Sequence, residues 1–228
     1  MLNMLEERTS NCKQHGHPEF ALFYDEEQLL EEDVNWLIFA LEEEVANGQR
    51  FQDGDVFQIG WMVAKVRTHK DNLLTLSEPD LKELPLRYVN SVTNCLMHLR
   101  WQKEILSSYG LHQPSIHPSV SQNVLICNHL VDSSEFAMQR LLAEDDDSGW
   151  QIVCTDPDHD HQDVTQLECL SLYELATSVQ AKTIPFLALP EGSQLIIGDK
   201  EICFLLNDEI QTLKEDSFLH SLGYTDTE

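Results

Sequence analysis

The feature that most constrains the fold is an amphipathic segment, 25–47, followed at once by a different hydrophobic pattern. Its apolar residues recur every three or four positions, the spacing of a helix with one buried face. We expect Asp25 to cap this helix, with Gln28 three residues later, and Asn47-Gly48 to end it. Acidic residues occupy the opposite face, so the segment predicts a surface helix.

Residues 55–67 switch to a strand pattern rich in β-branched and aromatic residues. A polar turn at 69–72 leads into a second apolar run, 73–76, and the three segments predict a hairpin. A second helix is expected over 91–109, ended by Gly110.

Beyond residue 121 the pattern changes to short strands. We expect a helix from the capping box at Ser171–Glu174 to about Gln180, and a tight turn at Gly198-Asp199. The expected strands are 124–127, 136–142, 150–154, 193–197 and 201–206.

Between these halves, residues 114–121 contain two prolines and no periodicity, which is typical of a linker. The sequence therefore predicts an α/β (α+β) protein of two small domains, 1–113 and 122–228. Each is expected to be a mostly antiparallel sheet with helices packed on it.

Limited proteolysis should cut the chain first between Pro114 and Ser121, because an unpacked linker is more accessible than either domain. Mass spectrometry of the earliest fragments checks this. First cuts inside 91–109 or 193–206 would contradict the division.

The net charge of −26 constrains the partners. Such a field repels nucleic acid and anionic membranes and accelerates encounter with a basic protein, although acidity can also serve solubility alone. No segment approaches the roughly 18 apolar residues of a membrane span, and acids stand where a signal peptide would be basic. We expect a cytoplasmic protein. Its six scattered cysteines are expected to be mostly buried and reduced.

The loop Asp156–Asp163 alternates Asp and His and resembles the opening of a calcium loop. The match fails where a calcium loop needs Gly, at His161, and where it needs Glu, at Leu167. A transition-metal site from His159, His161 and nearby carboxylates is the alternative. A solvated acidic loop explains the residues more simply, so we expect no metal site and no cofactor.

The sequence also lacks the motifs of a nucleophilic or phosphate-binding enzyme. Cys127-Asn128-His129 places catalytic residue types side by side, but such dyads normally assemble from distant segments. We expect a protein that is not an enzyme.

Exposed carboxylates are the better candidates for recognition, because they can accept Arg and Lys side chains of a partner. Trp150, next to the main acidic run, is expected to point into the core. The residues expected to bind a partner are Asp145, Asp146 and Asp147, and after them Asp158 and Asp160.

Several short landmarks are similar to those of bacterial immunity-protein domains. They are Asp147-Ser148-Gly149-Trp150, Leu172-Tyr173-Glu174-Leu175, Ile184-Pro185-Phe186-Leu187 and Pro190-Glu191-Gly192-Ser193. Segments in the first half, among them Gln58-Ile59-Gly60-Trp61, resemble the N-terminal domain of two-domain members. The resemblance spans about residues 15–206. It implies an immunity protein of a type VI secretion or polymorphic toxin system, bound to a cognate toxin such as a nuclease effector.

The main hypothesis is therefore a cytoplasmic immunity protein that occludes a basic, nuclease-type toxin and binds neither nucleic acid nor membrane. Two alternatives stay open. One is a metal-dependent hydrolytic enzyme that uses the Asp156–Asp163 loop, and the other is an acidic adaptor or chaperone of a secretion component. A chaperone would bind an unfolded client, whereas an immunity protein binds a folded toxin.

Overall fold

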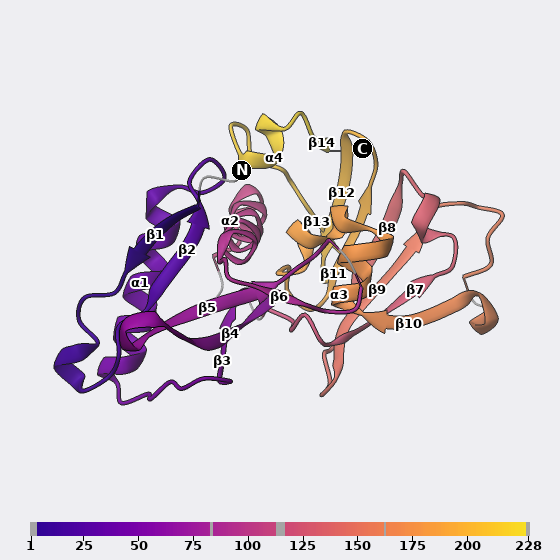
Figure 1. Cartoon of the computed structure of the whole chain (residues 1–228). Helices are drawn as coiled ribbons and strands as arrows, with labels where there is room; N and C mark the ends of the chain where they lie inside the picture. Colours follow the sequence, from indigo (N-terminus) through magenta and orange to yellow (C-terminus); the bar gives the residue numbers. More distant parts are fainter. Residues whose placement is uncertain (1–3, 83, 113–116, 162, 227–228) are drawn as a thin grey trace. The chain divides into compact units, whose positions relative to one another are not determined.

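The computed structural model describes residues 4–82, 84–112, 117–161 and 163–226 (Figure 1). The chain forms two compact units: residues 1–80 with 85–100, and residues 81–84 with 101–228. The boundary at Arg100 falls inside the helix α2 (Thr93–Ser108). Among the described residues, no helix is both long enough and apolar enough to cross a membrane.

The first unit combines strands with the helix α1 and the first part of α2. Its elements are β1 (Met4–Arg8), β2 (Ala21–Asp25), α1 (Glu31–Ala46), β3 (Val56–Ile59), β4 (Met62–His69), β5 (Leu73–Pro79) and β6 (Tyr88–Val89). β3, β4, β5 and β6 form an antiparallel sheet in that order, and β1 pairs with β2. Short 3-10 turns lie at Lys13–His15 and Lys70–Asn72.

The predicted helices and hairpin are confirmed, with two corrections. The predicted cap Asp25 is wrong, because Asp25 ends β2 and its carboxylate accepts hydrogen bonds from Glu27 and Gln28 in a turn. The helix instead begins after Leu30, whose N–H donates to Asp33. The single strand expected over 55–67 is a β3–β4 hairpin, since Gly60 (φ 59°) allows a two-residue turn.

The second unit is built on one eight-stranded sheet. Its strands are β7 (Asn123–Cys127), β8 (Phe136–Arg140), β9 (Asp147–Cys154), β10 (Leu167–Ser171), β11 (Ser193–Ile197), β12 (Glu201–Leu206), β13 (Glu209–Gln211) and β14 (Thr225–Asp226). Its helical segments are α3 (Leu172–Glu174), a π-helical turn (Leu175–Val179), α4 (Phe218–Ser221) and 3-10 turns at Leu130–Asp132, Val164–Gln166 and Ala181–Phe186.

The strand order is β10-β7-β9-β8-β11-β12-β13, with β14 beside β12. All the pairs are antiparallel except β7–β9 and β12–β14. The five strands predicted after residue 121 are confirmed, as is the capping box of Ser171 with Glu174. The α/β class with antiparallel sheets is therefore confirmed.

The linker expected over 114–121 remains a prediction. Its residues 114–116 lie outside the described part of the chain. The described remainder contains no helix or strand, but Val120 is buried and its carbonyl accepts the N–H of Tyr173 (3.0 Å). The end of the segment is thus attached to the second unit.

A buried arginine and tryptophan hold the core of the second unit together. Arg140 and Trp150 are paired across β8 and β9, and they are 1% and 0% exposed. The Arg140 guanidinium donates to the carbonyls of Leu187 (3.3 Å) and Leu189 (2.5 Å), and the Trp150 indole N–H donates to Leu187 (3.2 Å). The prediction that Trp150 points into the core is confirmed.

Gly149, which precedes this tryptophan, has φ 76°. A Cβ atom there would overlap the carbonyl oxygen of Leu141, and the N–H of Leu141 donates to the Gly149 carbonyl (2.8 Å). Only glycine combines this backbone conformation with so close an approach.

Gly149→Ala should lower the free energy of unfolding by roughly 3–5 kcal/mol. The cost of holding alanine in the left-handed conformation adds to the cost of the overlap between its Cβ and the Leu141 backbone. Gly48→Ala is the matched control, since Gly48 also has positive φ (102°) but a Cβ there meets nothing within 4 Å. It should cost about 1–2 kcal/mol. Urea unfolding measures both, and equal losses would contradict the overlap.

In the first unit, the indole N–H of Trp61 donates to Nδ1 of His98 (3.3 Å). Both side chains are buried. Burial lowers the pKa of His98 to about 4, because the imidazolium form would lose its hydration. His98 is therefore neutral in the folded protein at neutral pH.

Because the pKa of His98 is lowered on folding, the unfolded chain binds its proton first as the pH falls. Stability should decrease from about pH 6.5 to about pH 4, by about 3 kcal/mol from this residue. His98→Asn keeps an acceptor for Trp61 but cannot titrate there. Urea unfolding across this pH range should show a shallower slope in the variant, and identical slopes would contradict the assignment.

Candidate functional site

The strand β9 positions both groups of acids that the sequence singled out. Asp145, Asp146 and Asp147 lie exposed where the chain enters β9. Asp145 has φ 44°, which aspartate tolerates, and the side chain of Gln122 donates to the carbonyls of Asp145 and Asp147. The Asp147 carboxylate accepts the N–H of Gly149 (2.9 Å). This turn is therefore ordered by hydrogen bonds within it and from Gln122.

Asp158 and Asp160 are also exposed, but they follow the opposite end of β9. Asp147 and Cys154 are seven residues apart along the strand, a separation of about 23 Å. The structure therefore does not bring the two acidic groups together into one cluster. One partner could contact both only by spanning the sheet.

Between the two groups, one face of the sheet is open. Alternate residues of β9 are buried, whereas Gln151 and Val153 are partly exposed on the other face. A hollow of about 370 Å³ on this face is lined by residues that include Leu125, Gln151, Val153, His161 and Ile196.

A second hollow of about 490 Å³ shares Leu125 and Gln151 with the first and continues toward the β8–β9 turn. Leu142, which is 67% exposed, lines it together with Asp145 and Asp147. Exposed apolar side chains such as Leu142 and Ile196 thus lie beside glutamines and acids. Such a mixed surface is suited to binding a protein with basic and apolar side chains. The exposed leucines of this turn were missed from the sequence.

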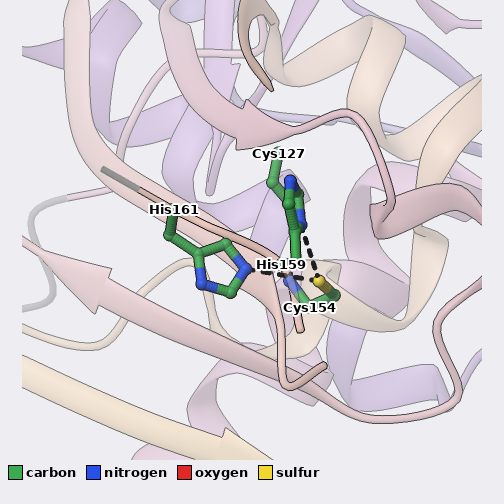
Figure 2. A group of neighbouring side chains, drawn as sticks. All are labelled: Cys127, Cys154, His159 and His161. Carbon is green, nitrogen blue, oxygen red and sulfur yellow. Dashed lines mark hydrogen bonds between the residues drawn. The ribbon is translucent and has the colours of Figure 1, made fainter. Parts of the chain in front are cut away.

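At the other end of β9, four side chains converge (Figure 2). Cys127 ends β7 and Cys154 ends β9, and His159 and His161 follow in the next loop. Because β7 and β9 are parallel neighbours, their last residues meet at one edge of the sheet. One potential ligand atom from each of the four residues lies within 4.8 Å of the other three.

The sulfur of Cys154 is central in this group, which we call the Cys–His cluster. It lies 3.2 Å from Nδ1 of His159 and 3.3 Å from Nε2 of His161. The sulfur of Cys127 accepts the backbone N–H of Cys154 (3.1 Å). Burial raises the pKa of the Cys154 thiol.

The cluster is largely shielded from solvent. Cys127, Cys154 and His159 are buried, and His161 is partly exposed. The ring of His129 stacks on that of His159, with centroids 4.1 Å apart. Within the described residues, Nε2 of His159 has no hydrogen-bond partner.

This arrangement differs from both sequence-based interpretations of the loop. His159 is buried rather than solvated, and the exposed Asp158 and Asp160 do not belong to the group. Cys127 gathers with His159 and His161 rather than acting with its neighbour His129. The signal in the sequence is that two predicted apolar strands each end in cysteine. It indicates a cluster only if the two strands are parallel neighbours, because their last residues then lie at the same end of the sheet.

The landmarks that suggested immunity domains have structural roles. Ser148 donates to the carbonyl of Asn123 (2.6 Å), and Gly149 and Trp150 form the close packing described above. Gly192 has φ 84° and donates its N–H to the carbonyl of Arg140 (2.9 Å). The roles of these residues are therefore in the packing of the second unit.

Residues 101–208 match the family model of the Imm33-like domain, an immunity protein family. The match begins at Trp101, where the second unit resumes, and it covers strands β7 to β12. No curated protein and no solved structure matches the chain. The match supports an immunity protein and suggests a role that is not enzymatic.

Proposed function

We propose that this protein is a cytoplasmic immunity protein that binds and neutralises a cognate secreted toxin, a nuclease effector of a type VI secretion system. The observation that carries the proposal is the match of residues 101–208 to the Imm33-like domain. The charge of −26 supports the nuclease class, since a nuclease presents a basic groove to phosphate.

We further propose that the toxin docks on the open face of the sheet in the second unit. Asp145 and Asp147 line the second hollow, and Asp146 lies between them in the same turn. We expect these three acids to contact the toxin first, and the exposed Asp158 and Asp160, which follow the other end of β9, to contact it second. The area of this face is similar to the area that one partner buries in an ordinary protein–protein interface. This follows because β9 is about 23 Å long and neighbouring strands lie about 4.8 Å apart. The acids steer the encounter, and the exposed apolar side chains of the face are buried on binding.

The direct test is co-expression of this chain with a candidate toxin, sought first among the products of the neighbouring genes. Cells should survive only when the chain is present, and the two purified proteins should form a stable complex that lacks nuclease activity. A toxin that kills despite the chain would contradict the proposal. Binding only to unfolded toxin would favour a chaperone instead.

The acidic border can be tested by removing charge without disturbing the turn. The triple variant Asp145→Asn, Asp146→Asn, Asp147→Asn keeps an acceptor for Gly149 and tolerates the positive φ of Asp145. Its association rate with the toxin should fall by about tenfold at low salt, because steering acts mainly on the on-rate. The difference should shrink as salt is added.

The matched control is Glu27→Gln, Glu43→Gln, Glu44→Gln, which removes the same charge from exposed positions in the first unit. It should keep the association rate within about twofold of wild type. Stopped-flow association at two salt concentrations compares the three proteins. Equal rates, with an affinity that does not respond to salt, would show that the interface lies elsewhere.

A further inference from the structure

We propose that the Cys–His cluster binds one Zn²⁺ ion through Cys127, Cys154, His159 and His161. This proposal does not rest on the proposed function, because it is argued only from the positions and chemistry of these four side chains. The donors are two sulfurs and two imidazole nitrogens, a set that zinc prefers in four-coordinate structural sites.

The separations of the donors fit a single ion. Around tetrahedral zinc, with bonds of about 2.3 Å to sulfur and about 2.0–2.1 Å to nitrogen, neighbouring donors lie about 3.3–3.8 Å apart. Here the Cys154 sulfur lies 3.2 and 3.3 Å from the two histidine nitrogens, and all four donor atoms lie within 4.8 Å of one another. The two Cys154–histidine distances are within about 0.4 Å of those around zinc, and each remaining pair needs to close by no more than about 1.5 Å.

The same geometry argues against an iron–sulfur cluster with two cysteines and two histidines. That cluster places the cysteine pair and the histidine pair on different irons. Here one sulfur contacts both histidine nitrogens, so the two types of donor share one centre. A Cys127–Cys154 disulfide would use the sulfurs alone and leave the convergence of His159 and His161 unexplained.

A zinc ion here would be structural rather than catalytic. Four protein ligands fill a tetrahedral shell and leave no position for water or substrate. Two ligands come from the rigid ends of β7 and β9, and two come from the loop after β9. The ion would therefore fix this loop, and with it the exposed Asp158 and Asp160, against the edge of the sheet.

The first test is the metal content of the protein itself. The chain is purified through a tag without histidines and without chelators, and it is analysed by elemental mass spectrometry. We expect about one zinc per chain. After removal of zinc, added Co²⁺ should give the visible bands of tetrahedral cobalt and the near-ultraviolet charge-transfer band of a cobalt–thiolate bond.

Cys154→Ser and His161→Ala should each weaken zinc binding by more than about 100-fold. Loss of a residue that only hydrogen-bonds to a metal ligand costs roughly 10–100-fold, and these two variants remove a ligand itself. His161 is partly exposed, so this variant should fold even if Cys154→Ser does not. The matched controls are Cys169→Ser and His220→Ala, which change exposed residues outside the cluster. Both should retain one zinc per chain.

Zinc should also protect the loop. At free zinc about 100 times the dissociation constant, the melting temperature of the metal-free protein should rise by roughly 5–10 °C. Proteolysis within 155–163 should slow in parallel, and neither effect should occur in His161→Ala.

Three results would overturn the proposal. The first is wild-type protein whose thiols titrate as free and which neither contains nor takes up zinc. The second is a Cys127–Cys154 disulfide in protein purified under reducing conditions. The third is His161→Ala protein that binds zinc as tightly as wild type does. None of these measurements involves the toxin. A failure of the zinc proposal is therefore distinguishable from a failure of the proposed immunity function.

Discussion

The parallel pairing of β7 with β9 is the constraint on which the candidate sites of the second unit depend. The chain leaves β7, forms β8 two positions away, and returns through β9 into the gap between them. This path gives β9 a partner on each side. It also carries the acidic turn to one end of the strand and the Cys–His cluster to the other, so the two candidate sites lie on opposite ends of one element.

The packing of Arg140 against Trp150 keeps this arrangement in place. A guanidinium without water is costly to bury, and here backbone carbonyls of 187–189 and the tryptophan ring replace the lost hydration. The segment 187–189 is thereby attached to the β8–β9 pair. Three of the landmarks that resemble immunity domains take part in this contact or adjoin it, through Trp150, Leu187 and Gly192. Their roles are structural.

Much of the secondary structure followed from the sequence because the periodicities were long or clearly bounded. The two long helices, the Ser171 capping box and the strands after residue 121 are examples. Asp25 was misassigned because a residue at a strand end can form the same local hydrogen bonds as a helix cap. The turn at Gly60 was missed because the apolar pattern continues through it.

The candidate sites were harder to predict, because each depends on strand order. The acids at 145–147 could be recognised as exposed, but the open sheet face beside them requires knowing which strands are neighbours. In the same way, Cys127 and Cys154 are 27 positions apart in the sequence, and the β7–β9 pairing brings them together. Local patterns report which residues are exposed or buried, whereas convergence of distant side chains is a property of topology.

The toxin is proposed to bind the open sheet face of the second unit. Hydrogen–deuterium exchange of the chain, alone and with the folded toxin, tests it most directly. The toxin should slow exchange in 141–146 and 155–161, at the two ends of β9, and should leave the exposed loops of the first unit unchanged. Protection confined to residues 4–80, with both ends of β9 unchanged, would contradict it.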